Sequence, residues 1–407
     1  MAAESLVVVG GGLAAARAVE AIRAGGHDGP LVLVGKEASL PYDRPPLSKG
    51  VLAGAATVDS AMLHPPQWYA EREVDLRLGV AAVRLDPQRH TLTLADSTEL
   101  AWDRLLLATG STPRRLDVPG AELDNVLYLR TDVDSTTLRA RLESGRPVVI
   151  VGAGWIGLEV AAAARGHGCE VTVVEPQSTP LKGVLGEQVG TRFADVHRGH
   201  GVSFRFGAGV DRLVGDTAVS AVVTTTGETI PAETVVVGVG ITPDTRLAAE
   251  AGLEVDNGIV CDSALRTSHP EVFGAGDAAS WFNPILQQRL RVEHWANAHS
   301  SGFAAGRSML GEAVVHDELP YFFSDQYDFG LEYVGHTAPG DPVDVVVRPG
   351  PTDDAYLALW VAQGRVVAGM HVNMWETIDD LRGLVRSGQA VDPRRLADPS
   401  LPLLNGG

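Results

Sequence analysis

The feature that most constrains this chain is a repeated pattern in which an apolar run, a glycine-rich turn, a helical stretch and a second apolar run follow one another. The first copy spans residues 6–34 and the second residues 147–174. Each copy predicts a βαβ unit, which requires a parallel sheet and a right-handed crossover. The expected segments are strands at 6–10 and 31–34 around a helix at 13–23, and strands at 147–151 and 170–174 around a helix at 155–165.

The glycines of both copies match a dinucleotide-binding fingerprint. They read Gly10-x-Gly12-x-x-Ala15 in the first copy and Gly152-x-Gly154-x-x-Gly157 in the second. The first glycine permits a tight turn, the second lets backbone N–H groups approach a pyrophosphate, and the third small residue lets helix pack on strand. The amino end of the helix adds a favourable field for phosphate. The chain is therefore predicted to bind two dinucleotides.

The residue after the second strand of each copy bears on nucleotide choice. Glu175 follows the second unit's apolar run, where a carboxylate accepts ribose hydroxyls and repels the 2′-phosphate of NADPH. Residues 176–182 contain no arginine to bind such a phosphate, which favours NADH. In the first unit the corresponding acid is Glu37, preceded by Lys36, and this position also fits a helix-entry or surface role.

Composition narrows the class of protein. With 407 residues, 45% hydrophobic and 21% charged, the chain is expected to be a soluble globular protein of two or three domains. It shows neither a long apolar run nor a basic leader, so we expect a cytoplasmic, unprocessed protein without membrane association. A net charge of −18 argues against nucleic acid as a partner. Cys169 and Cys261 lack metal-ligand spacing, so we expect buried thiols and no metal site.

The remaining sequence predicts further strands and a third region. Apolar runs ending on glycine at 105–107 and 235–237 indicate short buried strands. The fold class expected is α/β, with two Rossmann-like dinucleotide-binding domains and a small α+β C-terminal domain. Other expected segments are β structure at 83–94 and 209–230, strands at 327–334, 343–347, 356–361 and 365–372, a helix at 377–387 and a proline-rich tail.

Several polar residues stand where they either serve a ligand or have a purely structural role. Residues 41–49 are too rich in proline for a helix before Leu47, and Lys49 at their end either sits beside a flavin ring or is solvated. Glu159 is either a dipole-favoured acid early in the second helix or faces a nucleotide cleft. Asp277 precedes a possible helix start. Its carboxylate either caps that helix or binds a ribityl hydroxyl.

An ordered set of motifs resembles a known family. The set is GxGxxA, PYDRPPLSK, LLLATGSTPR, GxGxxGxE with a terminal Glu, VVVGVGITPDT, DNGIVCD, TSHPEVFGAGD, VEHWANA and PYFFSDQY. It is similar to the FAD-dependent, NADH-dependent ferredoxin reductases of bacterial oxygenase and cytochrome P450 systems, to rubredoxin reductases and, more distantly, to apoptosis-inducing factor. The resemblance covers almost the whole chain.

The resemblance implies domains and site residues. The domains are an FAD-binding domain at 1–110 and 241–316, an NADH-binding domain at 111–240 and a C-terminal α+β domain at 317–407. The residues implied for FAD are Gly10, Gly12, Leu13, Ala14, Ala15, Glu37, Arg44, Lys49, Ala82, Ala108, Thr109, Gly110, Arg130, Gly276, Asp277, Glu293, His294 and Trp295. Those implied for NADH are Gly152, Gly154, Ile156, Gly157, Glu159, Glu175 and Gly240.

The resemblance also implies an activity. Hydride passes from NADH to N5 of FAD, with Lys49 and Glu159 as the catalytic ion pair, and electrons then pass singly to a small iron–sulfur ferredoxin, or to rubredoxin. The ferredoxin would feed a cytochrome P450 or Rieske-type oxygenase, and the reductase would be a monomer or a weak homodimer. The chain departs from the family pattern at Lys36, where an acid is common, and at Tyr321 and Phe323, where tryptophan is common.

Two other classes remain as alternatives. Disulfide reductases and NADH oxidases or peroxidases carry a redox cysteine after the first βαβ unit, but residues 43–54 contain no cysteine. A signalling flavoprotein would attract DNA or membranes, which the acidity of this chain disfavours. The downstream carrier stays open between ferredoxins and rubredoxin.

Overall fold

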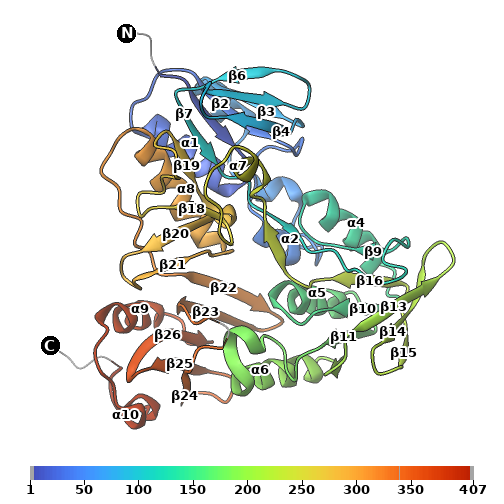
Figure 1. The fold of residues 1–407 in the computed structure, drawn as a ribbon. Helices are drawn as coiled ribbons and strands as arrows, with labels where there is room; N and C mark the ends of the chain where they lie inside the picture. Colours follow the sequence, from blue (N-terminus) through green and yellow to red (C-terminus); the bar gives the residue numbers. More distant parts are fainter. Residues whose placement is uncertain (1–3, 339, 404–407) are drawn as a thin grey trace. The chain divides into compact units, whose positions relative to one another are not determined.

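The computed structural model describes residues 4–338 and 340–403. In this part of the chain the residues form two compact units, each built from separate stretches of sequence (Figure 1). Unit 1 comprises residues 4–43, 59–112 and 242–320, and unit 2 comprises residues 44–58, 113–241 and 321–403, position 339 apart. None of the helices in the described residues combines the length and hydrophobicity that a bilayer crossing requires.

Unit 1 is organised around a parallel sheet with the strand order β19-β7-β1-β2-β3. Strand β1 lies in the middle and is buried along its whole length, with β2 and β7 paired to it in parallel. This is the sheet that the first βαβ pattern predicts. The strands are β1 (Leu6–Val9), β2 (Leu31–Gly35), β3 (Val74–Leu78), β7 (Arg104–Leu107) and β19 (Val272–Gly274).

Helix α1 (Leu13–Ala24) packs against helix α8 (Trp295–Met309) through close contacts between small residues. A Cβ added at Gly302 would lie 2.3 Å from the carbonyl oxygen of Ala14, and one at Gly306 would lie 2.6 Å from that of Ala18. The remaining elements of unit 1 are α3 (Pro66–Glu71), α7 (Arg246–Glu250), β4 (Ala82–Asp86), β5 (Thr91–Leu94), β6 (Glu99–Ala101), β18 (Ile259–Cys261), η2 (Gly276–Ala278), β20 (Ala279–Asn283) and β21 (Gln288–Leu290).

Unit 2 contains a second parallel sheet, with the order β12-β11-β10-β16-β9. Strand β10 (Val148–Val151) is fully buried and lies between β11 (Val171–Glu175) and β16 (Thr234–Val237). The other elements that belong to this part are α2 (Pro45–Ser48), β9 (Val126–Leu127), α4 (Asp132–Leu142), α5 (Trp155–Gly166), α6 (Lys182–Gly199), β12 (Val202–Phe206), β13 (Val210–Gly215), β14 (Val219–Thr224) and β15 (Thr229–Pro231). Three short elements lie where the chain passes from one unit to the other: η1 (Val58–Ala61), β8 (Ser111–Pro113) and β17 (Ile241–Pro243).

The C-terminal part of unit 2 is an antiparallel sheet of order β22-β23-β26-β25-β24. Its aromatic side chains pack against α5 and α6: the Trp155 and Phe322 rings are 4.6 Å apart, and those of Phe193 and Phe329 are 5.5 Å apart. One hydrophobic core thus spans both sheets of unit 2. The elements are β22 (Tyr321–Gln326), β23 (Phe329–Gly335), β24 (Asp344–Pro349), β25 (Tyr356–Ala362), β26 (Arg365–Val372), α9 (Ile378–Ser387) and α10 (Pro393–Ala397).

The predicted fold class is confirmed, and two local predictions are wrong. A helix begins at Pro45 rather than Leu47, because proline is well tolerated at the first helical position. The β structure predicted at 83–94 is confirmed, as the hairpin of β4 and β5. Asp277 lies in the short 3₁₀ turn η2, and the chain continues into strand β20 rather than a helix. The domain boundaries given above remain a prediction.

The close crossing of α1 and α8 predicts the effect of one added methyl group. Gly302→Ala should lower the free energy of unfolding by about 2 kcal/mol or more, because its Cβ meets backbone that cannot move aside. Gly199→Ala at the end of α6 is the matched control, since a Cβ there has open space and should be neutral or stabilising by up to about 1 kcal/mol. Thermal unfolding followed by circular dichroism compares the two, and equal effects would contradict the interpretation.

Candidate functional site

The first glycine-rich turn lies at the carboxyl ends of β1 and β7 in unit 1. Gly10 has φ +140°, and a Cβ on it would lie 2.1 Å from the carbonyl oxygen of Ala108, so only glycine fits. At Gly12, by contrast, a Cβ would meet no heavy atom of the described residues within 4 Å. Gly12 is also the N-cap of α1 and supplies no capping side chain. The open side of Gly12 and the N–H groups in the first turn of α1 therefore suit an anionic ligand.

Unit 2 repeats this geometry at the second turn. Gly152 has φ +99°, and its Cβ would lie 2.4 Å from the carbonyl oxygen of Gly238. Gly154, the N-cap of α5, again has open space around its missing Cβ in the described structure. Both turns fit a dinucleotide pyrophosphate, because no heavy atom of the described residues lies within 4 Å of the Cβ position at Gly12 or Gly154.

Glu175 is held directly beside the second turn. Its Oε2 accepts a hydrogen bond from the Ala153 N–H at 2.8 Å, and its Oε1 accepts one from the Gln177 N–H at 2.9 Å. Each carboxylate oxygen keeps a second lone pair for a ribose hydroxyl. Nearby, Ile156 is 43% exposed on α5, Gly157 packs on the Gly152 carbonyl, and Gly240 follows β16 with φ +99°.

The acids predicted for FAD in unit 1 also have hydroxyl partners. The Tyr42 hydroxyl donates to Glu37 Oε2 at 2.6 Å, and the Ser111 hydroxyl donates to Asp277 Oδ2 at 2.7 Å. The other predicted residues of this unit lie in α1 (Leu13, Ala14, Ala15), at the start of β4 (Ala82), after β7 (Ala108, Thr109, Gly110), in η2 (Gly276), and at or just before the start of α8 (Glu293, His294, Trp295). Of these, Trp295 donates its Nε1–H to Asp43 Oδ1 at 2.7 Å, and Thr109 donates its hydroxyl to the Asp244 carbonyl at 2.6 Å.

Lys49 and Glu159 form the ion pair that the resemblance implies. The Lys49 Nζ is 2.7 Å from Glu159 Oε1, and Glu159 is only 6% exposed. Two hydroxyls complete its shell: Ser48 donates to Oε2 at 2.5 Å, and Ser324 donates to Oε1 at 2.6 Å. A buried carboxylate needs such partners, because its loss of hydration is costly. All four residues belong to unit 2.

A chain of hydrogen bonds continues from Ser324 in one direction. Ser324 accepts from the Gln326 amide Nε2 at 3.1 Å, so the Gln326 Oε1 is free to accept from His197 Nε2 at 2.8 Å. His197 Nδ1 then accepts from the Tyr327 hydroxyl at 3.2 Å. Burial lowers the pKa of His197 to about 4, so its ring is neutral at pH 7, as this arrangement of donors and acceptors requires. Every bond in the chain points its donor toward Glu159.

A cavity of about 430 Å³ in unit 2 opens beside the ion pair. Lys49, Glu159 and Arg165 line it together with Asp325 and Tyr327. Asp325 is accessible to solvent, yet partial desolvation raises its pKa, and the nearby Glu159 carboxylate acts in the same direction while Lys49 opposes it. The cavity therefore gives the buried pair an opening that charged side chains line.

Two further residues predicted to contact FAD lie in unit 2 with Lys49. The Arg44 guanidinium donates to the carbonyl oxygen of Arg130, and the Arg130 N–H donates to Asp134 at 3.0 Å. Their assignment to FAD remains a prediction, as does every other predicted cofactor contact.

Sequence reasoning missed the residues that hold Glu159. Ser48 and Ser324 lie in the quoted motifs PYDRPPLSK and PYFFSDQY. The position of Ser48 directly before Lys49 could have indicated a hydroxyl partner for the ion pair. Gln326 belongs to the second motif as well. His197 had no such signal, because it reaches Gln326 from α6, far away in sequence.

Comparison with known proteins agrees with this geometry. Residues 4–302 match the model of the pyridine nucleotide-disulphide oxidoreductase family, and residues 321–405 match a reductase C-terminal domain. The chain belongs to the pyridine nucleotide-disulphide oxidoreductase family. Membership of this family implies FAD and NAD(P)H as cofactors.

Similar proteins include one curated relative and two solved structures. The relative is the ferredoxin–NAD(+) reductase component of the anthranilate 1,2-dioxygenase system of Burkholderia cepacia, 38% identical over 404 residues and covering 99% of each chain. The ferredoxin reductase for the CYP199A2 system from Rhodopseudomonas palustris superimposes with a TM-score of 0.93 at 34% identity, over 98% of each chain. The covalent putidaredoxin reductase–putidaredoxin complex gives a TM-score of 0.94 at 33% identity, over 99% of this chain and 98% of that chain.

The buried, neutral His197 predicts how stability depends on pH. Its folded pKa of about 4 lies below the ordinary value of 6.5, so the unfolded chain binds more protons between these pH values. The free energy of unfolding should therefore fall as pH decreases from about 7 to about 4, by about 2–3 kcal/mol from this residue. His197→Gln should make the free energy of unfolding less dependent on pH in this window, by the equivalent of up to one proton. Urea unfolding at several pH values measures this dependence. Parallel curves for both proteins would contradict the prediction.

Proposed function

We propose that this protein is the flavoprotein ferredoxin reductase of a bacterial oxygenase system. It oxidises NADH and delivers single electrons to a small iron–sulfur ferredoxin, which feeds a cytochrome P450 or Rieske-type oxygenase. The observation that carries the proposal is the pair of glycine-rich turns, each at the amino end of a helix and each leaving space that no described side chain fills. When bound, FAD supplies the conversion from a two-electron donor to a one-electron acceptor.

We assign the first turn to FAD and the second turn to NADH. The N–H groups at the start of α1 hold the FAD pyrophosphate, while Glu37 accepts from ribose and Asp277 from the ribityl chain. The turn at Gly154 and the start of α5 hold the pyrophosphate of NADH. Glu159 holds the Lys49 ammonium by an ion pair at the cavity of unit 2, so Lys49 would supply a positioned cation for the flavin.

The choice of NADH over NADPH rests on Glu175. Its carboxylate is fixed by two backbone N–H groups, so it presents a negative charge where a 2′-phosphate would lie. Lys182, the one cation in the segment 176–182, pairs with Glu187 at 2.8 Å and does not offset this charge.

Glu175→Ser should therefore weaken the binding of NADH and reduce the preference for NADH over NADPH. Loss of charge-assisted hydrogen bonds worth about 1.5–3 kcal/mol should raise the KM for NADH roughly 10- to 100-fold. The ratio of kcat/KM for NADPH to that for NADH should rise by at least as much. Glu170→Ser, which removes an exposed acid just before the same strand, serves as the control. An unchanged ratio in the Glu175 variant would show that another residue selects the nucleotide.

The partner is inferred from relatives. One is named the ferredoxin–NAD(+) reductase component of a dioxygenase system, and a solved structure shows putidaredoxin reductase joined to putidaredoxin. An iron–sulfur ferredoxin is therefore the expected acceptor, and rubredoxin is the second candidate. A disulfide reductase is disfavoured, because Cys169 and Cys261 are both buried and burial raises the pKa of the Cys261 thiol to about 12.

The test is an anaerobic assay of the purified flavoprotein. NADH should bleach the flavin absorbance, and cytochrome c reduction should then depend on an added ferredoxin from a panel that also includes rubredoxin. Gly154→Val should retain FAD but lose NADH-dependent bleaching, because its side chain fills the nucleotide space. A protein that holds FAD and is not bleached by NADH would favour a signalling role and contradict the proposal.

A further inference from the structure

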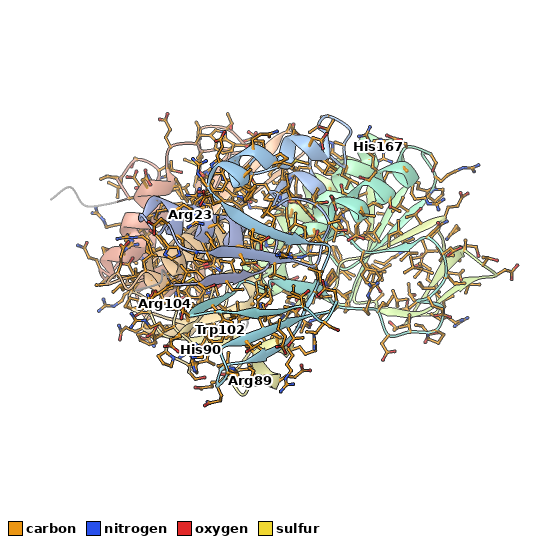
Figure 2. All side chains as sticks on the ribbon, turned by 90° about the horizontal axis from the view of Figure 1, so that it is seen from above. Arg23, Arg89, His90, Trp102, Arg104 and His167 are labelled. Carbon is orange, nitrogen blue, oxygen red and sulfur yellow. The ribbon has the colours of Figure 1, made fainter. Side chains whose placement is uncertain are left out.

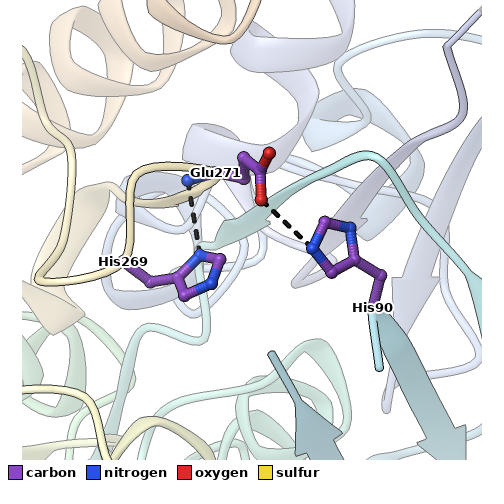
Figure 3. Close-up of side chains that lie close together, drawn as sticks. All are labelled: His90, His269 and Glu271. Atoms are coloured by element: carbon purple, nitrogen blue, oxygen red, sulfur yellow. Dashed lines mark hydrogen bonds and ion pairs between the residues drawn. The ribbon is translucent and has the colours of Figure 1, made fainter. Parts of the chain in front are cut away.

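We propose that His90, His269 and Glu271 form a binding site for one divalent transition-metal ion of the Zn²⁺ type. In unit 1 each of these residues offers a ligand atom, and these atoms lie within 4.8 Å of one another (Figure 3). The site is distinct from the glycine-rich turn, and the inference does not depend on the proposed function.

The three residues come from two loops of unit 1, one in the β4–β5–β6 sheet and one at the amino end of the parallel sheet. His90 lies in the turn between β4 and β5, and His269 and Glu271 lie in the loop that leads into β19. The Glu271 carbonyl accepts from the Leu105 N–H at 2.9 Å, which fixes this loop at the amino end of β7. Gly10 and Ala108 lie at the carboxyl ends of the same sheet, about 10 Å further along the strands. An ion here would not touch a bound dinucleotide.

The hydrogen bonds of His90 leave a lone pair facing a carboxylate. Its Nδ1 contacts the Trp102 carbonyl at 3.2 Å, and because a carbonyl can only accept, Nδ1 carries a proton. Its Nε2 lies 3.1 Å from Glu271 Oε2, which is also an acceptor. A metal ion placed between these two atoms would be bound by both of them. An Nδ1–H bonded to a backbone carbonyl is the arrangement that orients metal-binding histidines.

The third ligand is held loosely enough to move. The Glu271 N–H contacts His269 Nδ1 at 3.4 Å, a long and weak hydrogen bond. Tetrahedral Zn²⁺ with bonds of about 2.0–2.1 Å places its ligand atoms about 3.3 Å apart, close to the His90–Glu271 separation. His269 is half-buried and needs a shift of at most about 1.5 Å, because its ligand atom lies within 4.8 Å of the other two. Water would complete the coordination.

The surroundings hold the His90 imidazole in place. The Trp102 ring stacks on His90 at 4.5 Å with an interplanar angle of 9°, and meets His269 edge-on at 6.3 Å. Figure 2 shows His90 and Trp102 on a side of unit 1 that also carries Arg104 and Arg89. The Arg104 charge is paired with Glu4 at 3.2 Å, so it opposes a bound cation only weakly. Two imidazoles and one carboxylate favour Zn²⁺, Ni²⁺ or Cu²⁺ over Mg²⁺ and Ca²⁺, which prefer all-oxygen sites.

Unit 1 contains a matched control for this site. His64 Nε2 lies 2.6 Å from Glu20 Oε1, and the His64 ring stacks on Trp68 at 3.9 Å. Like His90 with Glu271 and Trp102, this pair combines a histidine, a carboxylate and a stacked tryptophan. Among the described residues, however, it has no third ligand within the same separation. Comparing the two pairs isolates the contribution of a three-ligand set.

The experiment is a Zn²⁺ titration of chelator-treated, FAD-loaded protein by calorimetry. We expect one site whose affinity falls at least 10-fold in each of His90→Gln, His269→Gln and Glu271→Gln, and is unchanged in His64→Gln. Flavin absorbance and circular dichroism confirm that each variant is folded. Titration of the wild type with Co²⁺ should also produce visible absorption bands of a histidine-bound ion. Absence of binding, or equal affinity in all four variants, would overturn the proposal.

Discussion

The buried carboxylate of Glu159 is the constraint on which the architecture of unit 2 depends. A charge that is 6% exposed must be matched by donors, and these come from stretches of chain that are remote in sequence. Ser48 and Lys49 reach it from the segment 44–58, and Ser324 reaches it from strand β22. This group therefore links the proline-rich segment and the C-terminal sheet to helix α5, in addition to the hydrophobic core that they share.

In unit 2 the hydrogen bonds that lead to Glu159 and the packing of the C-terminal sheet involve the same elements. The hydrogen-bond chain from Tyr327 to Glu159 crosses the layer where the aromatic rings of β22 and β23 pack against α5 and α6. Packing in this layer keeps water away, which strengthens each hydrogen bond and makes each unpaired group more costly. The orientation of the ion pair is therefore a property of the C-terminal sheet as much as of the nucleotide-binding sheet.

The parts of the fold that the sequence predicted are those with a local cause. The βαβ units follow from apolar runs and glycine turns within about thirty residues, and the structure confirms them. The ion pair of Lys49 and Glu159 came from the resemblance, not from spacing, because 110 positions separate the two residues. His197 with Gln326, and His90 with His269 and Glu271, were not predicted, because only the folded sheet brings such distant positions together. The local errors at Pro45 and Asp277 arose where proline and a capping acid suit more than one structure.

The segmented layout of both units has a consequence for synthesis on the ribosome. Unit 1 needs β19 and α8, which come from the stretch 242–320, to complete a sheet and a helix pair begun before residue 25. Unit 2 in turn waits for residues 321–403 to cover α5 and α6. Neither core can close while the nascent chain is short, so apolar strands such as β1 and β10 stay exposed during most of translation. Both units are thus expected to complete their folding late, after the stretches that close their cores have left the ribosome.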